Sequence, residues 1–250
     1  MKPSARYRAK PHLLCITLPK MSWNGGNLKT ILMIYDVNEL KREIRTVLDQ
    51  NKSSEPLREL GDIDTLSFDD IVGSKIADAA KIVILHAPIH LLGSGIPFGK
   101  GIEWKSAEGH GSGSVLLPDD FLRLVVFQMS DWSRAVSEAI SPSDAQYALQ
   151  SSRFPGVRGC PQKPVVAIVN TGVGMMLEFY SCTGGEGVGI KQATYIPKPR
   201  ILDETIELSH KIKDAVVYYS AYMVAVTMGQ SEQAQQLLNI SQSLLNDTTL

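Results

Sequence analysis

Two segments in the first third of the chain carry apolar residues at every third or fourth position, which is the spacing of one face of a helix. The first follows Asp36, a residue that can cap a helix, and runs through VNELKREIRTVLDQ. The second begins at Ser67-Phe-Asp-Asp70, which is close to a capping box with Asp in place of Glu, and continues to Pro88. We therefore expect two N-terminal helices. The apolar face of the first consists of Val37, Leu40, Ile44, Val47 and Leu48.

In the middle of the chain, the helical period gives way to short runs that are rich in β-branched and aromatic residues. One segment there, SPSDAQYALQ, instead predicts a short helix that Ser141 or Ser143 would cap. The later runs are separated by the glycine turns TGVG and TGGEGVG, and this arrangement indicates an antiparallel β-meander. The expected strands are GIEWK, FLRLVVFQM, PVVAIVN, MMLEFYSC and IKQATYIPK.

After Pro199 the helical period returns in ETIELSHKIKDAVVYYSAYMVAVTMG. Gly229 is placed to end this helix, and Ser231 begins another, so the short connection requires the two helices to pack as an antiparallel hairpin. The order of elements predicts an α+β fold with N-terminal helices, a central antiparallel β-meander and a C-terminal antiparallel helical hairpin, built around one connected core. The seam of the first C-terminal helix is expected to be Ile212, Val216, Tyr219, Met223 and Val226.

The domain organisation follows from where the regular pattern begins. We expect a single α+β domain over residues 36–250, preceded by an extended or disordered arm over residues 1–35. The arm contains basic side chains and the apolar run LLCITL, which is too short and too close to prolines for a signal peptide. In an alternative interpretation, residues 1–32 are not translated, because the well-patterned sequence begins at Met33.

Composition and charge are those of an ordinary folded protein. Of the 250 residues, 44% are hydrophobic and 20% are charged, and the formal net charge is −1, so charge gives no reason to expect nucleic-acid binding. No apolar run approaches the length of a membrane span, and we therefore expect no membrane contact. Cys15, Cys160 and Cys182 cannot all pair and match no metal-binding spacing, which indicates free thiols in a reducing compartment.

The stretch HLLGSGIPFGKGIEW, residues 90–104, raises the question of a phosphate-binding loop. Such a loop requires G-x-x-x-x-G-K-[ST], because backbone N–H groups surround the phosphates and a hydroxyl holds magnesium. Here the first glycine position is Ser94, the hydroxyl position is Gly101, and Pro97 removes an N–H donor. We therefore interpret the stretch as a loop between packed elements.

Other candidate sites lack the geometry that their chemistry needs. His86 and His90 have the spacing of two metal ligands on a helix, but Pro88 lies between them and interrupts a helix. Asp119 and Asp120 are adjacent, and adjacent residues of an extended chain point to opposite faces, so PDD indicates a turn. The run GGEGVG is not followed by a helix, as a dinucleotide site requires. We therefore expect no enzyme activity, no cofactor and no metal.

The loop SSRFPGVRGCPQKP is basic and contains an aromatic residue. It carries Arg153, Arg158 and Lys163, and guanidinium groups bind phosphates and carboxylates well. Two interpretations remain open: the loop contacts phosphate or an acidic partner surface, or it is a solvated connection in which Phe154 is packed.

Three segments resemble a family of structural proteins from tailed bacteriophages. SGSVLLPDDFLRLVVFQMSDWSRAVSEAIS, SSRFPGVRGCPQKPVVAIV and LEFYSC resemble the ring proteins beneath the portal in crAss-like phages that infect Bacteroides, with LPDDFLR the best match. The ending KDAVVYYSAYMVAVTMGQSEQAQQLL is similar to the closing helical hairpin of podovirus head-to-tail adaptor (connector) proteins. The resemblance covers residues 36–246.

The resemblance implies a virion protein made in the host bacterial cytoplasm. Its copies would form a homo-oligomeric ring in the tail below the portal, with a symmetry that matches the twelvefold portal. The ring would contact the portal protein and adjacent tail ring proteins and would line the channel through which DNA leaves, without sequence specificity. No catalytic residue, cofactor or metal comes with the resemblance. The expected inter-subunit or partner contacts are Lys100, Trp104, Arg153, Phe154 and Arg158.

Two other classes of function remain as alternatives. The first is a small cytosolic enzyme that uses the glycine-rich loop at residues 93–113, with Lys100 or His90 as the residue on which activity would depend. The second is a protein-binding module in which the same loop grips a protein ligand. The second alternative differs from the ring in stoichiometry, since a binding module need not close a ring.

Overall fold

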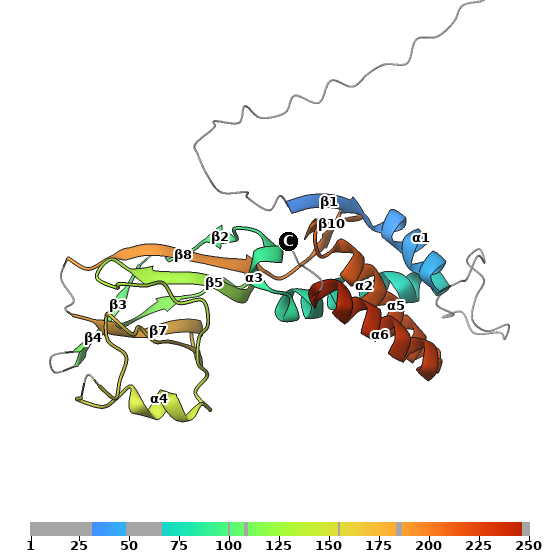
Figure 1. Cartoon of the computed structure of the whole chain (residues 1–250). Helices are drawn as coiled ribbons and strands as arrows, with labels where there is room; N and C mark the ends of the chain where they lie inside the picture. Colours follow the sequence, from blue (N-terminus) through green and yellow to red (C-terminus); the bar gives the residue numbers. More distant parts are fainter. Residues whose placement is uncertain are drawn as a thin grey trace, which may run out of the picture.

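The computed structural model places the chain in two lobes, one rich in helices and one built from β-strands (Figure 1). The expected mixed α+β fold with antiparallel sheets is confirmed. The expectation of one connected core is wrong, because the buried side chains form two clusters, one centred in each lobe. The residues that the structure describes are 32–48, 67–99, 101–107, 110–154, 156–183 and 187–246.

The helical lobe, called the α lobe below, combines helices from both ends of the described chain with a small sheet. Its strands pair in the order β1-β10-β9, all antiparallel. No helix in the described ranges is both long enough and apolar enough to cross a membrane. The elements of this lobe are β1 (Leu32–Asp36), α1 (Val37–Val47), α2 (Phe68–His86), α3 (Ile89–Leu92), β9 (Ile201–Leu202), β10 (Thr205–Ser209), α5 (Lys213–Thr227) and α6 (Ser231–Asn246).

The two predicted N-terminal helices begin at the residues that the capping signals indicate. The carboxylate of Asp36 accepts a hydrogen bond from the N–H of Asn38 at 2.8 Å, which satisfies one free donor of α1. Ser67 and Asp70 form a complete reciprocal capping box at the start of α2. The second helix ends at His86, two residues before Pro88, as the sequence predicts.

The β1-β10-β9 sheet was not expected from the sequence. Residues 32–35, which the sequence places in the arm, form most of β1, and residues 1–31 lie outside the described part of the chain. The predicted helix over ETIELSHKIKDAVV begins only at Lys213, because Thr205–Ser209 is strand β10. Asp203 and Glu204 both have positive φ angles, +48° and +58°, and this pair reverses the chain between β9 and β10.

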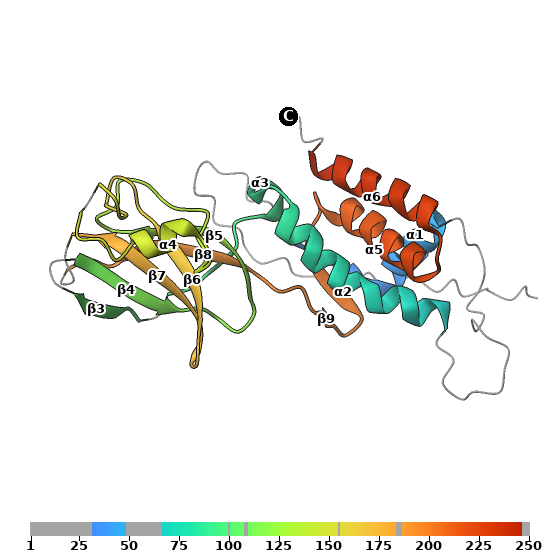
Figure 2. The same ribbon diagram turned by 90° about the horizontal axis from the view of Figure 1, so that it is seen from below.

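Helices α5 and α6 lie side by side and are joined by three residues (Figure 2). Gly229 ends α5 with a φ of +76°, and the N–H groups of Gly229 and Gln230 donate to the carbonyls of Val226 and Ala225, which completes a Schellman motif. The predicted seam is wrong in part, since Val226 is 52% exposed. The buried residues of α5 are instead Ala215, Val216, Val217, Ser220, Ala221, Val224 and Ala225.

The second lobe, called the β lobe below, contains two antiparallel sheets packed face to face. The sheets have the strand orders β2-β8-β5 and β3-β4-β7-β6. The predicted strands are present, but β7 and β8 belong to different sheets, so the strands do not follow one another as a single meander. The elements are β2 (Ile96–Pro97), β3 (Glu103–Ala107), β4 (His110–Leu116), β5 (Phe121–Met129), α4 (Ala145–Leu149), β6 (Val166–Thr171), β7 (Gly174–Cys182) and β8 (Ile190–Pro197).

The core of the β lobe is aromatic. Phe127 of β5 and Phe179 of β7 stack across the gap between the two sheets, with 6.1 Å between ring centroids. Trp132 packs edge-on against Phe127 at 5.6 Å. These rings are almost completely buried, and they hold the two sheets against each other.

The predicted short helix of the β lobe is shorter than expected. It spans Ala145–Leu149, and Asp144 rather than a serine occupies the cap position. The carboxylate of Asp144 reaches back to accept from the N–H of Ser141 at 2.6 Å, and Ser141 and Ser143 join their hydroxyls in the same turn. The serines therefore shape the turn before α4 and do not cap the helix.

The glycine stretch connects the two lobes. It runs from α3 into β2, so it lacks the strand-to-helix order of a phosphate-binding loop. Gly95 has a φ of +70°, and a Cβ there would lie 2.7 Å from the carbonyl oxygen of Tyr195. The glycine is therefore required for β2 to pack closely beside β8.

Arg123 of β5 fastens the β lobe to the α lobe. Its guanidinium donates to the carbonyl of Ile84 at 2.9 Å and to the carbonyl of Ala87, both at the C-terminal end of α2. A cation at this end of a helix also complements the helix dipole. Burial lowers the pKa of Arg123, and the charge of Glu138 partly offsets that effect.

Candidate functional site

The outer face of the α-lobe sheet exposes a group of apolar side chains. In β1, an edge strand, Leu32, Met33 and Ile34 are 47%, 49% and 68% exposed. Leu202 of β9 is 67% exposed, and Ile201 beside it is 37% exposed. We call these five residues the sheet patch. Exposed apolar groups on an edge strand are typical of a surface that another chain covers.

A groove of about 360 Å³ adjoins the sheet patch where β1 and β10 meet the end of β8. Glu207 of β10 is exposed on this face and lies opposite Ile34 in the strand register. Residues 201–207 contain three carboxylates, including those of Asp203 and Glu204 at the tip of the turn, and no lysine or arginine. The charged lining of the groove itself is mixed, with the acidic Asp120 and Glu207 and the basic Lys198 and Arg200. The apolar lining includes Leu32, Ile34, Leu92, Ile96, Pro197 and Leu202.

Asp120 of the PDD turn lines this groove. The N–H of Phe121 donates to the carbonyl of Pro118 at 2.9 Å, so these residues form a turn, as the sequence predicts. Asp120 accepts a hydrogen bond from the hydroxyl of Tyr195 at 2.8 Å. Burial, followed by this hydrogen bond, raises the pKa of Tyr195 to about 12. Asp120 is therefore occupied within its own lobe and serves to hold β5 against β8.

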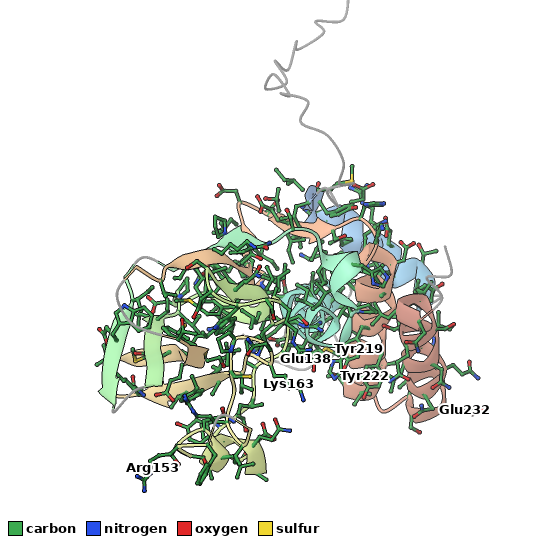
Figure 3. The ribbon with its side chains drawn as sticks, turned by 60° about the vertical axis from the view of Figure 1, so that its left-hand side comes forward. Glu138, Arg153, Lys163, Tyr219, Tyr222 and Glu232 are labelled. Carbon is green, nitrogen blue, oxygen red and sulfur yellow. The ribbon has the colours of Figure 1, made fainter. Side chains whose placement is uncertain are left out.

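A second exposed surface lies on the β lobe, at α4 and the loop that follows it. Phe154 is 71% exposed, so of the two interpretations of this loop, the one in which Phe154 is packed is wrong. Leu149 and Val157 are 46% and 47% exposed, and the exposed Arg153 projects away from the lobe (Figure 3). We call Leu149, Arg153, Phe154 and Val157 the loop knob. Unlike the sheet patch, which is apolar throughout, it combines apolar side chains with one charged group.

The other predicted contact residues lie in different settings. Arg158 is partly buried and donates to the carbonyl of Tyr180 at 3.4 Å, so it holds the loop against β7. Trp104 packs edge-on against Phe179, with 5.3 Å between ring centroids, and this contact places it on the core of the β lobe. Lys100 lies outside the described residues. The structure thus brings together Arg153 and Phe154, but not the full predicted set.

A buried carboxylate lies between the β3-β4-β7-β6 sheet and α4. Glu178 of β7 is 8% exposed and accepts hydrogen bonds from the ammonium of Lys105 and from the hydroxyls of Tyr147 (3.0 Å) and Tyr180. Tyr147 belongs to α4 and Lys105 to β3. The carboxylate therefore joins three separate elements, and a buried charge with several partners of this kind is stabilising only while all of them remain.

The hydrogen bonds also set the charge state of this cluster. Burial raises the pKa of Glu178, but the hydrogen bonds from Lys105, Tyr180 and Tyr147 and the charge of Lys105 outweigh it, so the pKa lies below its usual value. A cavity of about 360 Å³ opens beside the cluster, lined also by Arg158. Sequence reasoning missed this cluster. The signal was a lone glutamate inside the apolar run MMLEFYSC, since a charge on a half-buried strand needs partners.

The histidines and cysteines of the described ranges belong to no metal-binding cluster. His86 is at the end of α2 and its Nδ1 lies 2.8 Å from the carbonyl oxygen of Ile82. No group of three or more metal-binding side chains occurs among the residues that the structure describes. Cys182 is buried, and burial followed by the nearby Asp131 raises its pKa to about 12. Cys160 is only partly buried.

We therefore base the functional interpretation on the sheet patch and the loop knob. Both are exposed and largely apolar, and they belong to different lobes. No protein-family model matches the chain, and no curated protein is significantly similar to it.

Proposed function

We propose that the protein is a structural subunit of a ring in the head-to-tail connector of a tailed bacteriophage, below the portal. The observation that carries the proposal is the exposed apolar edge strand β1, in which three consecutive apolar residues face solvent. Such a strand is unfavourable on the surface of an isolated monomer, because an exposed apolar edge strand readily associates with another chain. A ring of identical copies covers it in every subunit.

The two-lobed architecture supports a ring over a two-fold dimer. A ring needs a heterologous contact, in which one surface of a subunit meets a different surface of the next. The chain offers two such surfaces on separate lobes, the sheet patch and the loop knob. The sequence resemblance to tail ring proteins beneath the portal, described above for LPDDFLR and the C-terminal helices, points to the same assembly.

In this role the protein contributes shape and contacts. Its partners are further copies of itself, the portal protein and the adjacent tail ring proteins. DNA passes through the channel without sequence-specific recognition. The near-neutral net charge of −1 suits a channel wall along which DNA slides. The protein belongs in the virion, after synthesis in the cytoplasm of the host bacterium.

The experiment is to determine the stoichiometry of the full-length chain, alone and with the portal protein, by native mass spectrometry and negative-stain electron microscopy. We expect closed rings whose symmetry matches the portal. Mass spectrometry of purified virions should also detect the chain. A chain that stays monomeric at every concentration, also in the presence of portal, refutes the proposal.

A further inference from the structure

We propose that the ring contact is made by insertion of the loop knob of one copy into the groove beside the sheet patch of the next copy. This inference rests on the proposed ring and names the surfaces that form it. Phe154 is its apolar centre, and Arg153 faces Glu207 of the neighbouring copy.

The shapes of the two surfaces support this pairing. Phe154 is 71% exposed on a loop that projects from the β lobe, and its neighbours Leu149 and Val157 are also about half exposed. The groove has a volume of about 360 Å³ and apolar walls that include Leu32, Ile34 and Leu202. An aromatic residue seated in such a pocket is the usual energetic centre of a protein–protein interface.

One pair of charges on the two surfaces is complementary. The loop knob contains a single charged side chain, the exposed Arg153, and no carboxylate. The groove lining contains the exposed carboxylate of Glu207, together with the basic Lys198 and Arg200. Arginine forms strong, directional hydrogen bonds with carboxylates, and charge complementarity selects the correct partner surface.

The two surfaces cannot meet within one chain. In Figure 1, β1 and β10 lie along the upper side of the molecule, whereas α4 and the loop after it lie at the lower edge of the β lobe. Figure 3 places Arg153 at the end of the molecule far from β1. A loop knob that enters the groove must therefore come from a second copy, and repetition of this contact from copy to copy generates a ring or an open chain.

Removal of the aromatic anchor is the first test, with an exposed apolar control. We expect Phe154→Ser to weaken self-association of the full-length chain at least about tenfold in sedimentation velocity and native mass spectrometry. Val173→Ser removes a residue that is 83% exposed in the turn between β6 and β7, and it should leave assembly unchanged. Both side chains are exposed, so circular dichroism should show the wild-type fold in each variant.

Charge reversal tests the pairing itself. Arg153→Glu and Glu207→Arg should each weaken association, because each places like charges together across the contact. The double variant should assemble again, since the introduced carboxylate of one copy then meets the introduced guanidinium of its neighbour. An equimolar mixture of the two single variants should form mixed contacts for the same reason. Lys163→Glu makes the same change of charge at an exposed site outside the loop knob, and it should have no effect.

The outcomes separate this inference from the proposed function. If the wild-type chain forms rings and neither Phe154→Ser nor the charge reversals affect them, the pairing is wrong and the ring proposal stands. If Phe154→Ser dissociates an open filament, the pairing is supported and the closed ring is refuted. If the wild-type chain never self-associates, both fail.

Discussion

The contact between the two lobes depends on Arg123, and its replacement by methionine gives a measurable prediction. Arg123→Met keeps the length of the apolar stem but removes both hydrogen bonds to the carbonyls of Ile84 and Ala87. A hydrogen bond that involves a charged group contributes about 1.5–3 kcal/mol, and the desolvation cost of the partly buried guanidinium is recovered in the variant. We therefore expect the free energy of unfolding to fall by about 2–4 kcal/mol.

Urea unfolding followed by circular dichroism measures this loss. With an m-value of about 3 kcal/mol per molar urea, the midpoint should fall by about 1 M. Hydrogen–deuterium exchange should also accelerate in peptides that cover Ile84 to Leu92, because the end of α2 loses its anchor. Both hydrogen bonds come from one guanidinium nitrogen, Nη1, and the ammonium of Arg123→Lys keeps the charge but lies on a shorter, more flexible stem, so this variant should lose about half as much.

Arg134→Met is the matched control, since Arg134 is exposed and its loss should change stability by no more than about 0.5 kcal/mol. If Arg123→Met unfolds at the wild-type urea concentration and exchange at the end of α2 is unchanged, the guanidinium does not hold the lobes together.

Three further predictions concern the fold. Glu178 has a lowered pKa in the folded chain, so its contribution to stability is present above the ordinary value of 4.5 and is lost as the pH falls below it. Glu178→Gln should lower the free energy of unfolding by about 1–3 kcal/mol at pH 7, and its melting temperature should fall less steeply with acidification than that of the wild type. An unchanged dependence of the melting temperature on pH contradicts this. Cys182 should resist alkylation at pH 8 until urea unfolds the chain, because its pKa is about 12, and peptide mass spectrometry that finds equal labelling in both states argues against its burial. Ser67→Ala should cost about 1 kcal/mol in urea unfolding through loss of the capping box, and a Ser67→Thr control should retain most of that stability; equal losses in both variants would mean that the cap is not responsible.

The features that the sequence predicts well are those that depend on neighbouring residues. The Asp36 cap, the Ser67 and Asp70 capping box and Gly229 each act within a few residues of their own position. Strand β5 is likewise present over the whole of FLRLVVFQM. In each case the physical cause is local, so it can be recognised in a short window of sequence.

The features that were missed depend on pairing between distant residues. The apolar spacing of residues 205–209 fits a helix as well as a strand, and β10 forms because β1 pairs with it across more than half of the chain. In the same way, β8 pairs with β5 and not with β7, and the glycine turn between β7 and β8 gives no sign of the change of sheet. Of the candidate contact residues, Trp104 also packs against Phe179, and this contact could not be predicted because only the folded sheet brings the two rings together.

The proposed contact makes the angle between the lobes part of the assembly. The loop knob belongs to the β lobe and the sheet patch to the α lobe, so the rotation from one copy to the next depends on how the lobes are oriented. A ring closes only if that rotation is the same in every copy. Arg123 and the two chain crossings, at Gly95 and at Pro197 to Pro199, hold this orientation.

Arg123→Met should therefore affect the closure of the ring more than the contact between neighbouring copies. We expect Arg123→Met to self-associate, because its contact surfaces are intact. Adding Phe154→Ser should weaken this association as much as it weakens that of the wild-type chain. The assemblies of Arg123→Met should nevertheless vary in subunit number or remain open in native mass spectra and negative-stain images, since a loosened lobe junction changes the rotation per copy. Arg134→Met should give uniform rings. Uniform rings from Arg123→Met would show that the junction does not set the curvature, and that the contact surfaces alone determine where the ring closes.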